Sequence, residues 1–178
     1  FQAGRSPGEA GSISTDLSGA GRIAPLACLY DGDPLSLVVA ARAQAAMTHN
    51  SPDAVDSAEF FARTLARVLD GQEPREALQA VQRGHFDRPP FDRWMADGIA
   101  SAAEPTRSAI RRFGQGCDVG AGFPGVIHLV AAYPDDLAGA LEANVMAGGD
   151  SAARGLLVGT LLAASTGVEL RWHRNLAT

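Results

Sequence analysis

Residues 148–155, Gly-Gly-Asp-Ser-Ala-Ala-Arg-Gly, join two apolar, helix-like stretches and indicate how the chain folds around them. Glycine readily adopts the left-handed conformation that ends a helix, so Gly148 and Gly149 predict a helix end. Asp150 is a favoured N-cap residue and predicts the start of the next helix. A carboxylate at a helix start, with small neighbours, also suits a cation or a phosphorylated ligand. The sequence leaves both interpretations open, a helix cap and a ligand site.

The two stretches joined by this segment are expected to form the hub of the fold. Residues 137–146 follow Asp135, which is the expected cap of that helix. Residues 151–166 carry no charge other than Arg154, so the second helix is expected to be buried on most sides. Its many Gly and Ala residues permit close contact with other helices.

Other helical patterns precede the hub. A short apolar segment at 23–30 is followed by predicted helices at 34–47, 52–70, 74–83, 91–103, 105–113 and 123–132. Residues 34–47 are apolar nearly all round, which predicts a central helix. Residues 123–132 favour a helix because Pro124 lies near the first turn, although their β-branched content also suits a strand. His128 in this segment is expected to be a core residue.

The clearest amphipathic pattern lies at 52–70, where Ser51 is a suitable N-cap and Pro52 takes the first helical position. Its predicted buried stripe consists of Ala54, Ala58, Phe61, Leu65, Val68 and Leu69. The charged residues on its other side predict a solvated face: Asp56, Glu59, Arg63 and Arg67.

The predicted fold class is all-α, because no strand-helix alternation is visible. We expect a compact orthogonal helical bundle around a buried, small-residue C-terminal helix. A single domain is predicted over residues 1–178, with a Gly/Ser-rich loop at 1–22 and helices over 23–178. A phosphate loop of the Gly-x-x-x-x-Gly-Lys type is excluded because the chain contains no lysine.

Composition narrows the class of protein. The chain has 178 residues, 46% of them hydrophobic, which is enough to bury a core. Its net charge of -5 argues against a nucleic-acid partner. Cys28 and Cys117 lie in no metal-binding or disulfide pattern, so a reduced, cytoplasmic protein is expected. No apolar run reaches the length of a membrane span. The start at Phe1, inside a loop-like stretch, suggests that residues upstream are missing.

Four segments in order resemble the ADP-ribosylglycohydrolase family. Residues 19–26, Gly-Ala-Gly-Arg-Ile-Ala-Pro-Leu, are similar to its Met-Arg-Ile-Ala-Pro loop, and residues 48–54 to its Thr-His-x-x-Pro-x-Ala motif. Residues 120–128 resemble its Pro-containing helix start. Residues 148–151, followed by a small-residue helix and Trp172, resemble its Gly-Gly-Asp motif. The resemblance implies an all-helical hydrolase that removes ADP-ribose from modified side chains by means of two Mg²⁺ ions.

The resemblance covers only about the C-terminal half of the family domain. It implies that the absent N-terminal half, or another subunit, supplies the Thr-Asp-Asp-type metal ligands and the acidic catalytic residue, so no catalytic residue is assigned within this chain. The family motif continues as Gly-Gly-Asp-Thr-Asp-Thr, whereas this chain has Ser151, Ala152 and Ala153 after Asp150. Only Asp150 remains as a carboxylate metal ligand, so Mg²⁺ is expected to bind partially or not at all.

The resemblance also implies a set of ligand-binding residues. His49 and residues 18–21 correspond to segments that contact ribose and diphosphate, where free backbone N–H groups suit phosphate oxygens. Residues 16–18, Asp-Leu-Ser, however, depart from the family's Gly-Asn-Gly at this place. Arg154 either pairs with Asp16 or Asp150 or reaches a phosphate. The complete candidate set is Asp16, Ser18, Gly19, Arg22, His49, Gly148, Gly149, Ser151 and Arg154, with Asp150 as metal ligand.

Two functions of different classes follow. The first is hydrolysis of a glycosidic bond to ADP-ribose or a related nucleotide sugar, incomplete or inactive in this chain by itself. The second is a non-catalytic ADP-ribose-binding or structural protein that has lost its metal centre, which the alanines at 152 and 153 favour. Expected partners are ADP-ribose or an ADP-ribosylated substrate and the missing half-domain. Exposed hub helices also predict a homo-oligomer.

Overall fold

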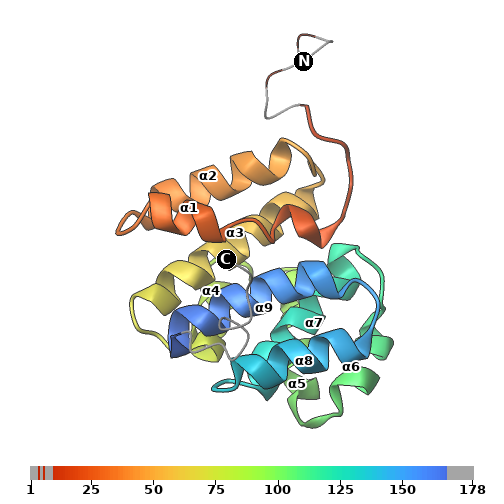
Figure 1. Cartoon of the computed structure of the whole chain (residues 1–178). Helices are drawn as coiled ribbons and strands as arrows, with labels where there is room; N and C mark the ends of the chain where they lie inside the picture. Colours follow the sequence, from red (N-terminus) through yellow and green to blue (C-terminus); the bar gives the residue numbers. More distant parts are fainter. Residues whose placement is uncertain (1–3, 5, 7–9, 168–178) are drawn as a thin grey trace, which may run out of the picture.

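The computed structural model describes residues 4, 6 and 10–167. Within them it contains helices and two isolated β-bridges but no strand, which confirms the all-α class (Figure 1). None of the helices described is both long and apolar enough to cross a membrane. The elements are η2 (Leu17–Gly19), α1 (Ala24–Leu29), α2 (Pro34–Ala46), α3 (Pro52–Leu69), α4 (Pro74–His85), α5 (Phe91–Ala100), η3 (Ser101–Ala103), α6 (Thr106–Phe113), α7 (Val119–Ala132), α8 (Leu137–Ala147) and α9 (Ser151–Thr166).

Helix α7 is the centre of the helical packing (Figure 1). It carries no Asp, Glu or Arg, and every residue from 121 to 131 is buried. It packs against α5, α6 and α9 and touches α3, α4 and α8. The ring of Phe123 contacts the rings of Phe60, Phe61 and Phe91, with centroids 4.8, 5.0 and 5.4 Å away. The uncharged surface of α7 suits this place in the middle of the bundle, where other helices surround it.

The start of α7 differs from the prediction. The helix begins at Val119, because Asp118 accepts a hydrogen bond from the Ala121 N–H at 3.1 Å and caps it. Pro124 therefore lies inside the helix and not in its first turn. A similar shift occurs at α8, which is capped by Asp136 and not by Asp135. When two possible cap residues lie a few positions apart, the sequence alone does not decide which of them starts the helix.

Helix α9 is less buried than predicted, and the hub is α7 with α9 packed on it. One stripe of α9 is buried: Ala153, Arg154, Leu157, Val158, Leu161 and Leu162. The opposite side is open, with Ala152 exposed and Leu156 50% exposed. The near absence of charge in this helix did not predict its burial correctly, because its exposed side also consists largely of small uncharged residues.

Helix α2 lies at the edge of the bundle, so the prediction of a central helix is wrong (Figure 1). It packs mainly against α3 and buries Leu37, Val38, Ala41 and Ala45. Its other side exposes Leu35 to 72% and Val39 to 68%. In the described part of the chain no helix covers this side.

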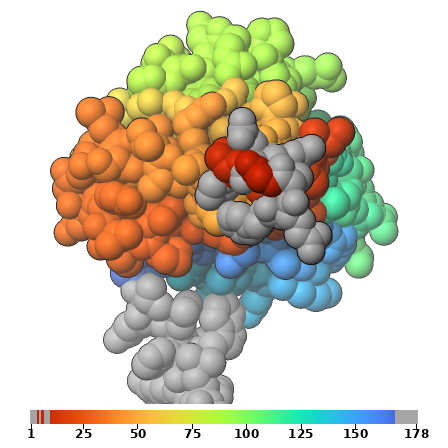
Figure 2. Space-filling model, turned by 90° about the horizontal axis from the view of Figure 1, so that it is seen from above, coloured from red at the N-terminus to blue at the C-terminus, as the bar shows by residue number. Residues whose placement is uncertain are grey.

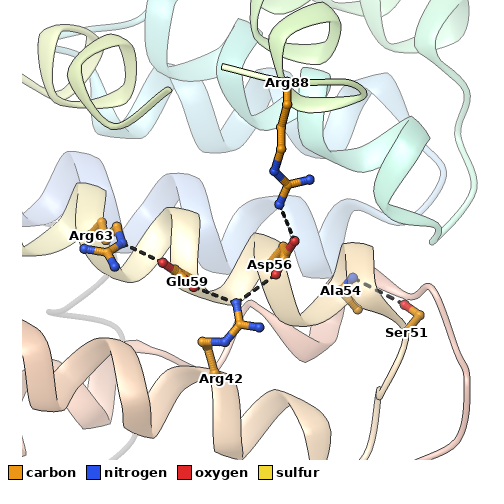
Figure 3. A network of polar contacts seen from close by, with 7 residues as sticks. All are labelled: Arg42, Ser51, Ala54, Asp56, Glu59, Arg63 and Arg88. Carbon is orange, nitrogen blue, oxygen red and sulfur yellow. Dashed lines mark hydrogen bonds and ion pairs between the residues drawn. The ribbon is translucent and has the colours of Figure 1, made fainter. Parts of the chain in front are cut away.

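Helix α3 starts at Pro52 with Ser51 as its cap, as predicted. The predicted stripe is buried except for Leu69, which is 51% exposed at the helix end. The charged side is not simply a solvated face. Asp56 and Glu59 are only 18% and 16% exposed, because Arg42 of α2 bonds both carboxylates and Arg88 of the α4–α5 connection bonds Asp56 (Figure 3).

His128 is a fully buried core residue, as predicted. Its Nδ1 lies 2.8 Å from Ser101 Oγ and its Nε2 lies 3.1 Å from Thr106 Oγ1. Both ring nitrogens thus have hydroxyl partners, and burial lowers the pKa of the imidazole below its ordinary value.

Candidate functional site

The turn between α8 and α9 has the predicted backbone. Gly148 and Gly149 have φ values of 75° and 69°, in the left-handed region. Asp150 accepts a hydrogen bond from the Ala153 N–H at 3.2 Å and caps α9. The helix-cap interpretation is therefore confirmed. Residues 148–150 form the Gly-Gly-Asp turn.

The α6–α7 connection holds this turn from outside. Gln115, in the α6–α7 connection, accepts a hydrogen bond from the Asp150 N–H at 3.0 Å through its backbone carbonyl. Its side-chain Nε2 donates to the Ala147 carbonyl at 2.6 Å. A Cβ at Gly149 would collide with the Gln115 backbone, so glycine is required there for contact as well as conformation. The α6–α7 connection and the turn form one unit.

Arg154 supports the turn from beneath. Its side chain is 1% exposed, its Nε donates to Asn144 Oδ1 at 2.9 Å, and its Nη2 donates to the Gly148 carbonyl at 2.6 Å. Among the described residues its partners are neutral, so the predicted ion pair with Asp16 or Asp150 is wrong. Burial lowers the pKa of the Arg154 guanidinium, and the nearby charge of Asp150 opposes this shift.

The N-terminal loop lies between two connections of the bundle. Asn50 donates to the Ser12 carbonyl at 2.6 Å, which joins the loop to the α2–α3 connection. Leu17 donates to the Cys117 carbonyl at 2.8 Å, which joins it to the α6–α7 connection. Figure 2 shows the red loop between the orange helices and the green-blue part of the chain. The loop thereby brings Asp16, Ser18 and Gly19 next to the other two segments.

The backbone N–H groups of residues 18–21 are hydrogen-bonded within this segment. Asp16 Oδ1 accepts from the Ser18 N–H at 2.8 Å, and its backbone carbonyl accepts from the Gly19 N–H at 3.3 Å. The N–H groups of Ala20 and Gly21 donate to the carbonyls of Leu17 and Ser18. The expectation of free N–H groups for a phosphate is therefore wrong, because the short 3-10 helix η2 and its Asp16 cap use them.

His49 lies against this loop. A Cβ at Gly19 would be 2.9 Å from His49 Cβ, so the absence of a side chain lets the two segments meet. His49 Nδ1 is 2.7 Å from Thr48 Oγ1, which leaves Nε2 as the other polar atom of the ring. Arg22 Nη2 donates to the same Thr48 hydroxyl at 2.5 Å and so reaches the same connection.

Cys117 connects the two parts of the site, and the sequence did not single it out. Its pKa is raised, first by a hydrogen bond to the Asp16 carboxylate and also by the charge of Asp150. Burial alone would raise the pKa of Asp16, but bonds from Ser18 and Cys117 and the nearby His49 lower it. Asp16 and Asp150 thus both act on one thiol, although they are far apart in the sequence. The sequence signals that could have placed a turn here are Gly114, Gly116 and the capping residue Asp118.

A family model described as ADP-ribosylglycohydrolase matches residues 1–177. The chain belongs to this family. The match spans all four segments that carry the resemblance, although Trp172 lies outside the described residues. A comparison with curated proteins finds no match.

The ADP-ribosylglycohydrolase family implies Mg²⁺ at the Gly-Gly-Asp turn, and the donor set of this chain does not fit that ion. No group of three or more His, Cys, Asp or Glu side chains that could hold a metal is found among the described residues. Ala152 and Ala153 offer no side-chain oxygen. The Asp150 carboxylate already caps α9, and Mg²⁺ requires near-octahedral oxygen coordination.

Proposed function

We propose that this chain is an ADP-ribosylglycohydrolase-like module that contributes the ligand-binding side of a site for ADP-ribose or a related nucleotide sugar. The observation that carries the proposal is the meeting of three segments: Asp16 to Gly19 of the N-terminal loop, His49, and the α6–α7 connection that holds the Gly-Gly-Asp turn. These are the positions that the family resemblance assigns to ribose, diphosphate and metal.

In this proposal the chain binds and orients the ligand and does not complete the reaction. His49 Nε2 and the Ser18 hydroxyl are suited to hydrogen bonds with ribose hydroxyl groups. Hydrolysis of the glycosidic bond requires an acid and an activated water. We assign neither to a residue of this chain, so turnover is expected to need residues from an N-terminal half-domain or another subunit.

The alternative is a non-catalytic binding or structural protein with the same fold. Two observations favour it: the missing oxygen donors at positions 152 and 153, and the internally bonded N–H groups of the η2 loop. Such a protein would bind ADP-ribose without Mg²⁺, or would not bind it.

Calorimetry with ADP-ribose tests the proposal. We expect the chain to bind ADP-ribose saturably. In His49→Ala the affinity for ADP-ribose should fall at least tenfold, about the effect of removing one or two polar contacts. The matched control is His85→Ala, since His85 is exposed at the end of α4. Equal affinities of the two variants for ADP-ribose would contradict the assignment of His49. No binding of ADP-ribose by the unmodified chain would favour the structural alternative.

A turnover assay on ADP-ribosylated protein tests whether this chain binds the ligand without completing the reaction. The chain by itself is expected to release no ADP-ribose, with or without Mg²⁺. Release by the 178-residue chain would show that it holds a complete catalytic site.

A further inference from the structure

Arg154 is a charged side chain in an apolar interior, and the fold makes room for it. It is only 1% exposed and is the largest of the fully buried side chains described. Its chain passes over Gly125 of α7, where a Cβ would lie 2.9 Å from Arg154 Cδ. The same Cβ would lie 2.8 Å from Ile110 Cδ1 of α6, so Gly125 leaves room for both the Arg154 and the Ile110 side chains.

The buried guanidinium makes no ion pair with a carboxylate among the described residues, although the charge of Asp150 lies near enough to act on it. Nε and Nη2 bond the Asn144 side chain and the Gly148 carbonyl, and both acceptors are neutral. Nη1 is buried and has no hydrogen-bond partner among the described residues. Buried charges in proteins are normally paired, because an unpaired one has a large desolvation cost. Arginine keeps its proton even so, which leaves a fixed positive charge beneath the turn.

We propose that Arg154 is a built-in cation that holds the Gly-Gly-Asp turn in place of a divalent metal ion. Arg154 fixes the Gly148 carbonyl, two residues before Asp150, and Asn144 Nδ2 fixes the Ser151 carbonyl, directly after it, at 2.8 Å, so both carbonyl oxygens are held by protein donors. A divalent ion at Asp150 would meet a fixed positive charge in a poorly screened interior, and this repulsion weakens its binding. Arg154 is thus a positioning residue, and ligand binding at this turn is independent of Mg²⁺.

The first test is a titration of the unmodified chain with Mn²⁺, followed by electron paramagnetic resonance. Mn²⁺ prefers the same oxygen ligands as Mg²⁺ and its free form is observed directly. We expect no saturable site at millimolar Mn²⁺. Saturable binding of Mn²⁺ that disappears in Asp150→Asn would overturn the proposal. This test does not depend on whether a variant of Arg154 folds.

The second test removes the positive charge. Arg154→Met frees the Gly148 carbonyl and the Asn144 side-chain oxygen, which leaves two oxygen donors without a competing cation. We expect Mn²⁺ to raise the Tm of this variant by about 2–4 °C and to leave the Tm of the unmodified chain unchanged. The gain is expected to vanish when Asp150→Asn is added.

Two further variants separate charge from structure. Arg154→Lys keeps a positive charge and is expected to remain insensitive to Mn²⁺. Arg112→Met removes an exposed arginine that pairs with Glu104 and controls for net charge. A folded Arg154→Met chain without a Mn²⁺ response, or an equal response in Arg112→Met, would overturn the proposal. If Arg154→Met does not fold, Arg154→Gln replaces it with the same expected response.

This inference rests on the proposed function only in placing a ligand at the turn, and its tests are separable. ADP-ribose calorimetry in EDTA and in Mn²⁺ reports on the ligand, and we expect equal affinities. Absence of ADP-ribose binding overturns the proposed function, whereas the Mn²⁺ titrations decide the role of Arg154. Affinity that increases at least tenfold with Mn²⁺ overturns the inference while the proposed function stands.

Discussion

Two helical glycines of this chain have opposite surroundings. A Cβ at Gly98 of α5 would lie 2.5 Å from Ile127 Cβ and 2.8 Å from the Pro124 carbonyl. Gly84 of α4 is exposed, and no other part of the described chain comes within 4 Å of the place that a Cβ would take there. The first glycine allows α5 to approach α7, and the second has no contact that requires it.

We therefore expect opposite effects of the same substitution. Gly98→Ala should lower the free energy of unfolding by about 1–3 kcal/mol through overpacking. Gly84→Ala should raise it by about 0.5–1 kcal/mol, because alanine favours the helix. Urea denaturation of both variants checks this. A stable Gly98→Ala chain would mean that α5 and α7 can move apart without cost.

His128 predicts a pH dependence of stability. Ser101 Oγ lies 2.8 Å from both the Gly98 carbonyl and His128 Nδ1, so its proton can go to the carbonyl while Nδ1–H donates to Ser101. The pKa of the buried imidazole is lowered. Below the unfolded pKa of about 6.5 the unfolded chain then binds more protons than the folded chain. The contribution of His128 is complete above that pH and is lost as the pH falls toward the folded pKa.

The measurement is the free energy of unfolding at pH 7.5 and pH 5.5, for the unmodified chain and for His128→Asn. The variant should be less stable at pH 7.5 by about 1–3 kcal/mol, since a buried polar partner is left unsatisfied. Its loss of stability on acidification should be smaller. An identical pH slope in both chains would exclude His128 as a source of the dependence.

At the scale of elements, Asp56 joins three parts of the bundle. This residue of α3 lies 2.8 Å from Arg42 of α2 and 2.6 Å from Arg88 of the α4–α5 connection (Figure 3). Glu59 extends the network to Arg63 at 2.8 Å. Because Asp56 and Glu59 are largely shielded from water, the network holds α2 at the bundle edge better than isolated surface pairs would.

Asp56→Asn should therefore lower the free energy of unfolding by about 1 kcal/mol, at the upper end for partly exposed pairs. The matched control is Asp97→Asn, whose pair with Arg93 is longer, at 3.6 Å, and more exposed. For the control we expect about 0–0.5 kcal/mol. Denaturation in low and high salt checks both, and equal effects of the two substitutions would show that the network adds nothing.

For the whole molecule, the main feature is apolar surface without a cover in the described part of the chain. A groove of about 840 Å³ lies between α8 and α9, beside Val145, Met146 and Leu156, which are 63%, 68% and 50% exposed. The outer side of α2 adds Leu35 and Val39. Apolar patches of this kind favour association with another polypeptide.

We expect the chain by itself to self-associate as its concentration rises, when followed by light scattering. Leu156→Glu should shift it toward monomer if the α8–α9 groove is involved, and Leu35→Glu if the α2 side is. Ile13→Glu is the control, because Ile13 is 87% exposed but belongs to neither surface. A monomer at all concentrations would contradict the prediction of a homo-oligomer.

The sequence by itself determined the local features of this protein. Ser51 with Pro52 starts α3, and the turn at Gly148 and Gly149 is followed by the Asp150 cap, because each signal acts within one helical turn of backbone. The all-α class followed from the absence of strand-helix alternation, and the family from the resemblance of four segments in their order.

Only the tertiary structure decided which helix is central and which residues meet. Helices α2, α7 and α9 all have apolar sequences, and their burial depends on how many partner helices surround each of them. The contact of Cys117 with Asp16 and the neutral partners of Arg154 likewise join residues that are distant in the chain or in different helices. Such contacts form only when the backbone brings segments together, so periodicity and capping signals carry no information about them.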